Sequence, residues 1–524
     1  MDSPGLNPSH QRPQPSPPPP EPSPGLDLGD VQGVLLHGYR EMHELALLFL
    51  RIEDAAACGA WLRELADTAI TTSDPVEHAQ RARREGRDYA RVNVALTPRG
   101  LAALGLPEEV LATLPPELRE GMARRAREHL RDVDGNAPEH WQFGGADSGD
   151  GIHLLLMLYA ADAERMERLL HDYGVRAAQQ GLREVHVQRC VRRHRPGDPP
   201  GYFRDHFGFL DGLSQPRLEG FKDPAGHPRD YDRPVKRGEF ILGHDNEYGE
   251  RSPSPHVPES LAGAEALPGV PGRPGWRDLG HDGSYLVVRK LEQDVEAFEA
   301  FLGTHASLAP EGAHEDRREW LAAKLVGRWR SGAPLVASKG CPLHRLFAFL
   351  FRKEKAKPPR MPRHDAEGVD NSFLYARDDP HGHGCPVTAH ARRCNPRDGV
   401  PPSPRASLEV TRRHRILRRG FSYEDASGKG LMFIALNTHP SRQFEFIQRG
   451  WVHYDQLGGM DGAEDPLSGD GGGRLIIPQR PLRQCVAGLQ QFVKTRGGGY
   501  FFLPGLKALR FIAAQAQQAS RRRP

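Results

Sequence analysis

The sequence is poor in cysteine. Six cysteines are spread over 524 residues, and no two of them form a Cys-x-x-Cys pair. Small secreted domains that depend on disulfides carry cysteine at much higher density, so a disulfide-stabilised scaffold is excluded. The low cysteine content suits a reducing compartment.

Long apolar runs are also absent. The longest, residues 154–161, has the length of a strand, whereas a helix that crosses a bilayer needs about 20 residues. The first 28 residues contain ten prolines and lack the apolar stretch of a secretory signal peptide. These features predict a cytoplasmic protein with no signal peptide and no transmembrane segment, and they leave export by another route open.

Neither sign of charge dominates. Lys and Arg number 71 and Asp and Glu 68, which gives a net charge of +3. This balance gives no reason to propose nucleic acid or an anionic membrane as a partner. Hydrophobic residues make up 38% of the chain, enough for a sizeable core, and the length indicates more than one domain. Assembly as a homo-oligomer is left open.

The sequence does contain an order of strands and helices that occurs twice. In the first half, strands are predicted at 45–52, 91–96, 152–159 and 183–188, and helices at 54–67 and 162–173. Asp54 is placed to cap the first of these helices, and Gly174 to end the second. If two short helices near 99–104 and 116–130 form an insertion, the order is βαββαβ, the ferredoxin-like pattern.

The second half repeats this order loosely. Strands are predicted at 284–290, 414–418, 431–436 and 499–503, and helices at 294–302 and 443–451. The expected fold class is therefore α+β, with two tandem ferredoxin-like domains and long loop insertions. The predicted parts are a disordered Pro-rich tail at 1–28, an N-terminal domain at 29–200, a linking segment at 201–283, a C-terminal domain at 284–515 and a basic tail at 516–524.

The first candidate functional motif spans residues 208–212, Gly-Phe-Leu-Asp-Gly. Asp211 stands there between apolar and small residues. A carboxyl group in such surroundings is suited to proton transfer, because burial favours its neutral form. The alternative is a structural turn in which Asp211 bonds its own backbone, and turns of that kind are common.

The second candidate motif is a stretch rich in His and Cys. Its members His381, His383, Cys385 and Cys394 could form a zinc site, although their spacing matches no usual zinc motif. In another interpretation His390 is an axial ligand of a haem, and the other residues are polar side chains of a loop that bind no metal. Covalent attachment of haem is not indicated, because Cys-x-x-Cys-His is absent. In a third interpretation His390 is an ordinary residue on the surface of a helix and binds neither a metal nor a haem.

The third candidate motif is Arg-His-Arg-Ile-Leu-Arg-Arg-Gly at 413–420. By the period of a strand, Ile416 and Arg418 share one face, and Leu417 and Arg419 share the other. An arginine on an inward face needs an anionic partner, such as a propionate or a peroxide oxygen. The alternative is an edge strand that carries solvated charges.

Together these motifs resemble the dye-decolorizing peroxidase family. Residues 208–212 have the form of its GxxDG motif, residues 385–397 are similar to its CPxxAHxRxxNPR stretch, and residues 415–420 are similar to its RILRRG segment. Further similar segments lie at 30–33, 238–249, 443–451 and 496–505. The resemblance covers residues 29–515, and three motifs in this order are far more specific than a lone GxxDG.

The resemblance implies a haem peroxidase that cleaves hydrogen peroxide and oxidises bulky organic reductants, dye-like or phenolic, in one-electron steps. The cofactor would be non-covalent haem b in the C-terminal half, with His390 as the iron ligand. Asp211 would carry the peroxide proton, and Arg418 would stabilise developing negative charge. Arg397 is expected to pair with a haem propionate. The alternative function is a haem-binding or haem-iron-removing protein with little peroxidase turnover.

Two residues depart from the pattern of the family. His244 stands where an aromatic residue is usual, and Cys394 replaces a small or hydroxyl residue. Neither belongs to the three motif residues Asp211, His390 and Arg418. The departures therefore bear on local packing and on contacts at the edge of the haem.

Overall fold

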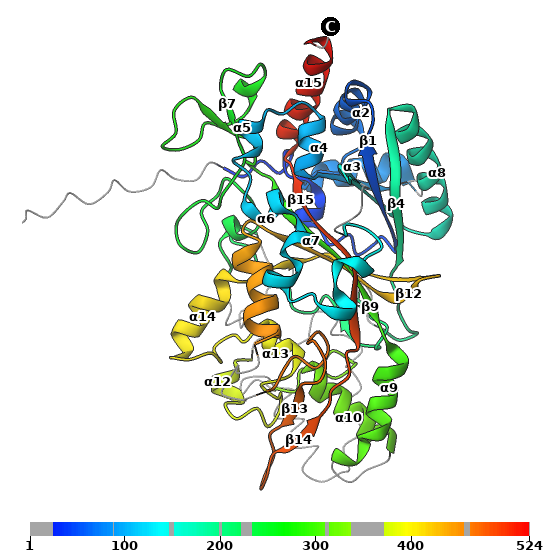
Figure 1. Ribbon diagram of the computed structural model, residues 1–524, viewed down its shortest axis with the longest axis vertical. Helices are drawn as coiled ribbons and strands as arrows, with labels where there is room; N and C mark the ends of the chain where they lie inside the picture. Colours follow the sequence, from blue (N-terminus) through cyan, green and yellow to red (C-terminus); the bar gives the residue numbers. More distant parts are fainter. Residues whose placement is uncertain are drawn as a thin grey trace, which may run out of the picture.

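One antiparallel sheet organises the computed structural model (Figure 1). The described residues are 25–86, 89–145, 151–198, 202–221, 233–309, 314–336, 371, 373–454 and 462–522. Most of the predicted Pro-rich tail, the basic residue at 523 and part of the predicted linking segment lie outside them. The nine-stranded sheet has the order β10-β12-β9-β15-β2-β3-β1-β4, and β11 pairs with β12.

The N-terminal half has the predicted βαββαβ order. Its elements are β1 (Glu44–Ile52), α2 (Ala55–Thr68), β2 (Arg91–Leu96), β3 (Leu154–Ala160), α8 (Ala163–Gln179) and β4 (Leu182–Val191). Asp54 caps α2 as predicted, since its side chain accepts hydrogen bonds from the backbone of Ala56 and Ala57. Helix α3 (Pro75–Glu85) was not predicted. It buries none of its residues and therefore has no apolar stripe to signal it.

The C-terminal half repeats the order around a second set of antiparallel strands. Its elements are β9 (Ser284–Gln293), α9 (Val295–Thr304), β10 (Leu417–Arg418), β11 (Phe421–Asp425), β12 (Gly428–Asn437), two helical segments (Ser441–Glu445 and Ile447–Val452) and β15 (Val493–Leu503). The strand predicted at 414–418 is shorter, because helix α14 (Pro404–Arg413) ends only at His414. The two half-sheets meet where Phe502 of β15 faces Leu96 of β2.

Alternate residues of the central strands enter two different cores. On β1, Leu48 belongs to one buried cluster and Phe49 to another. The first cluster includes side chains of α2 and of α15 (Leu506–Arg522), which lie side by side in Figure 1. Helix α15 differs from the basic tail expected from residue 516, since the helix continues to Arg522 and Ala516 is buried.

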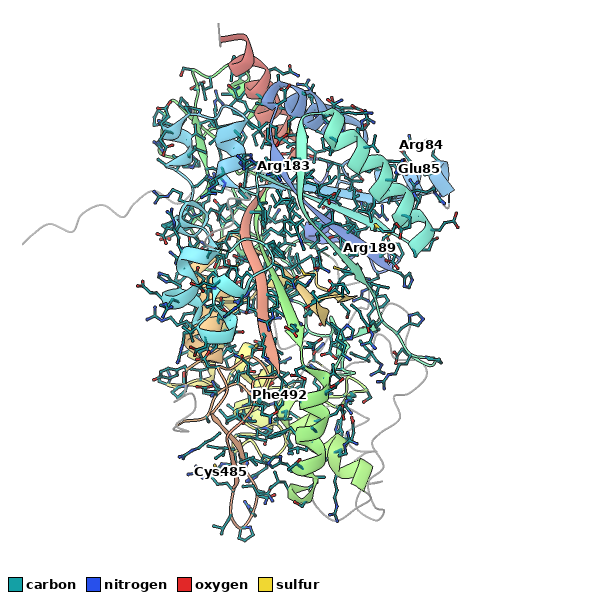
Figure 2. All side chains as sticks on the ribbon, turned by 45° about the vertical axis from the view of Figure 1, so that its right-hand side comes forward. Arg84, Glu85, Arg183, Arg189, Cys485 and Phe492 are labelled. Carbon is teal, nitrogen blue, oxygen red and sulfur yellow. The ribbon has the colours of Figure 1, made fainter. Side chains whose placement is uncertain are left out.

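The two ends of the sheet lie close to each other. Gln188 on β4 donates a hydrogen bond to Asp425 on β11, with Nε2 3.0 Å from Oδ2. Arg183 and Arg189 also lie on β4 (Figure 2) and form ion pairs with Glu53 and Glu167. Charged side chains of this kind discourage a terminal strand from pairing with another chain.

None of the described helices has both the length and the apolar composition that a membrane span requires.

Gly174 does not end α8, because the helix continues to Gln179. A Cβ at this position would meet no atom within 4 Å. Gly174→Ala should therefore raise the free energy of unfolding by about 0.5–1 kcal/mol, since alanine loses less backbone entropy in a helix. Chemical denaturation measures the change. Gly59→Ala in α2 is the matched control and should destabilise, because its Cβ would come within 2.7 Å of Ala516. A lower stability for Gly174→Ala would contradict the prediction.

Candidate functional site

The four predicted site residues line one cavity of about 310 Å³ in the described part of the chain. They are Asp211, His390, Arg397 and Arg418. Apolar side chains form much of the remaining wall, among them Phe209, Leu431, Phe433, Ile447, Val452 and Leu467. A cavity with apolar walls and a few convergent polar groups is typical of a cofactor site.

Asp211 reaches the cavity from a short hairpin. Strand β6 (Leu210–Asp211) pairs with β5 (Phe203–Arg204), and Asp211 lies opposite Phe203. The backbone N–H of Gly212 donates to Oδ1 of Asp211 at 2.6 Å, and Gly212 has a φ of +77°, which favours glycine. The turn considered as an alternative is therefore present. It does not remove the carboxylate from the cavity, because Asp211 is among the lining residues.

Arg418 comes from β10 and is fixed through its backbone. Its N–H donates to Oε1 of Gln215 at 3.1 Å, and its carbonyl accepts from Nε2 of Gln215 at 3.2 Å. Gln215 thus ties the loop after Asp211 to β10. Ile416 and Arg418 both line the cavity while Leu417 is buried in the core, as the strand alternation predicts. The Arg418 guanidinium forms no hydrogen bond or ion pair with the described residues.

His390 begins helix α13 (His390–Cys394) and is held by a buried carboxylate. Its Nδ1–H donates to Oδ2 of Asp465 at 2.9 Å. The other oxygen of Asp465 accepts from the backbone N–H groups of Leu467 and Ser468, each at 2.9 Å. Asp465 therefore fixes the ring orientation, and Nε2 is the nitrogen left for a ligand.

His390 and Asp465 each stabilise the charged form of the other. Burial opposes protonation of His390, but the Asp465 carboxylate and Cys394 outweigh it, so the pKa of His390 lies well above its ordinary value. Burial likewise opposes ionisation of Asp465, yet His390 holds the pKa of that carboxyl below its ordinary value. A negatively charged partner increases the electron density that the imidazole can offer to a metal.

The zinc alternative does not match the geometry. No three of His381, His383, Cys385 and Cys394 bring their ligand atoms within 4.8 Å of one another among the described residues. Cys394 instead lies beside His390, with Sγ 3.8 Å from each ring nitrogen. This contact follows from the helix, because residues four apart share one face.

Arg397 is buried at the cavity wall. Its Nη1 donates to the backbone carbonyl of Phe373 at 2.7 Å and to that of Asn371. Its guanidinium lies 4.0 Å from the centre of the Phe373 ring. The Asn371 amide in turn donates to the carbonyl of Leu213 at 2.7 Å. Arg397 therefore connects the segment after His390 to the loop after Asp211.

Sequence reasoning missed two acidic residues of the site, Asp465 and Asp205. Asp465 follows His390 by 75 positions in a Gly-rich stretch, and no local pattern marks it. Asp205 lies in the cavity wall, and burial raises its pKa to about 6. Its position six residues before Asp211, in the polar triplet at 204–206 between aromatic residues, is a signal that could have found it.

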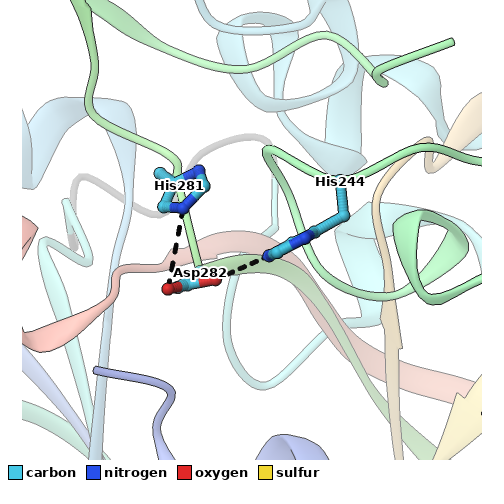
Figure 3. Close-up of side chains that lie close together, drawn as sticks. All are labelled: His244, His281 and Asp282. Carbon is cyan, nitrogen blue, oxygen red and sulfur yellow. Dashed lines mark hydrogen bonds and ion pairs between the residues drawn. The ribbon is translucent and has the colours of Figure 1, made fainter. Parts of the chain in front are cut away.

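A second group of possible ligands lies outside this cavity (Figure 3). His244 Nε2 donates to Oδ1 of Asp282 at 2.7 Å, and His281 Nε2 lies 3.7 Å from Oδ2 of Asp282. Both His244 and Asp282 are buried. His244 does not line the cavity that holds His390, so this departure from the family pattern bears on packing outside that cavity.

Comparisons with known proteins agree on one group. No family model matches the chain. The dye-decolorizing peroxidase msp1 of Mycetinis scorodonius is 27% identical over 93% of this chain and 88% of its own length. The multifunctional dye peroxidase of an Amycolatopsis strain is 28% identical over 89% of this chain and 92% of its own.

Solved structures show a similar fold. The structure of a DyP-type peroxidase from Anabaena covers 93% of this chain and 94% of its own, with a TM-score of 0.69 and 22% identity. An ancestral D-type dye-decolorizing peroxidase covers 93% and 98%, with a TM-score of 0.69 and 26% identity. These similarities confirm the expected α+β fold.

Proposed function

We propose that this chain, which is similar over most of its length to dye-decolorizing peroxidases, a class of haem peroxidases, binds haem b without a covalent link and uses hydrogen peroxide to oxidise bulky organic reductants. One observation carries this proposal. His390, oriented by the buried Asp465, faces the same cavity as Asp211 and Arg418, whose guanidinium has no partner in the described part of the chain.

The residues of the cavity fit a haem. Nε2 of His390 is free for iron, because Nδ1 is committed to Asp465. Phe209, Leu431 and Phe433 give the wall the apolar character that a porphyrin ring needs. Arg397, buried at the wall, is the proposed partner of a propionate, since an arginine can bind a carboxylate through two parallel hydrogen bonds. A bound haem would supply the iron that exchanges electrons with the peroxide and with the reductant.

Asp211 and Arg418 divide the work on peroxide between them. A carboxylate can accept a proton from one peroxide oxygen and return it to the other, which assists heterolytic cleavage of the bond between them. Arg418 stays protonated and can only donate hydrogen bonds and supply positive charge to the departing oxygen. The backbone bonds through Gln215 hold the Arg418 strand against the Asp211 loop.

The proposal is tested with the purified full-length protein. We expect a Soret band, haem that an organic solvent can extract, and peroxide-dependent oxidation of an anthraquinone dye and of a phenol. Protein that takes up no haem when haem is added would contradict the cofactor. Protein that holds haem normally but oxidises neither compound would contradict the peroxidase and favour the haem-binding alternative.

A further inference from the structure

A second and larger cavity lies on the other side of the Asp211 hairpin. Its volume is about 560 Å³. Asp211, Gly212 and Arg418 line both cavities, so these residues form the wall between them. The rest of the lining comes from distant parts of the chain, including the loop before β1, the end of β4 and the start of β11.

The charge of this cavity is strongly unbalanced. Among the described residues, Asp211 is its one acidic lining residue. The arginines that line it are Arg40, Arg192, Arg204, Arg217, Arg418 and Arg419. Arg204 pairs with Asp198, Arg419 donates to the carbonyls of Val34, Leu35 and Arg418, and Arg217 also has a partner.

The guanidinium of Arg192 is held in place, but its hydrogen-bonding capacity is not fully used. Its guanidinium lies between Phe203 and Phe421, 4.4 Å and 4.2 Å from their ring centres. Nη2 donates to the carbonyl of Gly38 at 2.7 Å, whereas Nη1 is buried and has no hydrogen-bond partner among the described residues. An unsatisfied buried donor on a charged group is costly and rare in native structures. Burial also lowers the pKa of Arg192 to about 10, with Arg40 acting in the same direction.

Two further arginines offer donors to the same space. Arg418 has no side-chain partner among the described residues. Arg40 is exposed, and its guanidinium lies 5.2 Å from the ring centre of Tyr202. Aromatic side chains accompany these charges, because Tyr202, Phe203 and Phe221 also line the cavity. A guanidinium fork matches the two oxygens of a carboxylate or sulfonate, and the rings match an aromatic body.

We propose that this cavity is a binding site for a small aromatic anion, whose carboxylate or sulfonate group Arg192 and Arg40 hold beside Arg418. The anion would satisfy the buried Nη1 of Arg192 and offset the repulsion between the arginines. Its aromatic ring would contact Tyr202 and Phe221. This site shares a wall with the His390 cavity but lies on the other side of that wall, and binding there needs no peroxide.

Isothermal titration calorimetry of the full-length protein with its haem tests the proposal. The probe is 2-naphthalenesulfonate, and 2-naphthalenesulfonamide is its neutral control. We expect the sulfonate to bind at least about 10-fold more tightly, because hydrogen bonds to charged groups are worth this much or more. Equal binding of the two compounds, or no binding of either at millimolar concentration, would overturn the proposal.

Variants locate the site. Arg192→Gln and Arg40→Gln should each weaken sulfonate binding about 10-fold or more, while Arg405→Gln on α14, whose side chain is 92% exposed, should leave it unchanged. Arg40 is exposed, so its variant remains informative if the Arg192 variant fails to fold. Unchanged affinity in the Arg40 variant, or an equal loss in all three variants, would overturn the assignment. Neither result bears on the peroxidase proposal, which the dye assay tests separately.

Discussion

Asp211→Asn should slow the reaction of the protein with hydrogen peroxide by about 10²–10⁴-fold, the usual contribution of a general acid–base group. Asparagine keeps the shape of the side chain but cannot carry the proton between the two oxygens. The dependence of the rate on the ionisation of this carboxyl group should disappear as well. Stopped-flow measurement of the Soret change after mixing with peroxide, repeated across pH, gives both quantities.

Arg418→Leu should slow the same reaction by about 10²–10³-fold, the usual effect of losing one charge-stabilising donor. Since arginine stays protonated, the loss should be similar at every pH. The two ranges overlap, so they do not rank the two residues. Asp172→Asn on the exposed side of α8 and Arg405→Leu are the matched controls and should react like the wild type. Wild-type rates in both site variants at every pH would show that the peroxide side of the site is misplaced.

His390→Ala should yield protein that purifies largely without haem or with an altered Soret band, because the proposed iron ligand is gone. The haem-to-protein ratio and the absorption spectrum measure this outcome. His383→Ala is the matched control, since His383 lies in the same segment but does not line the cavity. Normal haem content and spectrum in His390→Ala would refute the ligand.

Asp465→Asn separates positioning from ligation. Asparagine can still accept the Nδ1 hydrogen bond but carries no charge, so haem should bind about 10–100-fold more weakly, the usual effect of an outer partner of a metal ligand. The reduction potential of the haem should also rise, because the imidazole donates less electron density. A potential equal to that of the wild type would show that Asp465 only fills space.

The sequence predicted the regular elements where a periodic pattern had a core to face. β1, β2 and β3 could be predicted because they are short apolar runs buried on both faces, and α2 because its buried residues repeat at helical spacing. Helices α3 and α14 escaped because charged residues dominate them and few of their side chains are buried. Gly174 is an exception to the rule that glycine ends a helix, because α8 continues past it and its position faces open space.

The motifs identified residues that lie together in the fold, but they gave no sign of residues that only tertiary structure brings to the site. Asp211, His390, Arg397 and Arg418 each lie in a short recognisable segment, and all four line one cavity. Asp465 reaches His390 only through tertiary structure. The arginine-rich cavity likewise combines Arg40 with Arg192 and Arg418, which are far apart in the sequence. No local pattern predicts that they share a space.

The position of β15 has a consequence for synthesis on the ribosome. β15 pairs with β9 on one side and meets β2 on the other, yet it is the last strand of the sheet to be made. Until residues 493–503 emerge, β9 and β2 each expose an edge that can pair wrongly. At about 5–20 residues per second, the nascent chain carries these open edges for many seconds. Wrong pairing of the growing chain with its neighbours is therefore a hazard until the last strand is made.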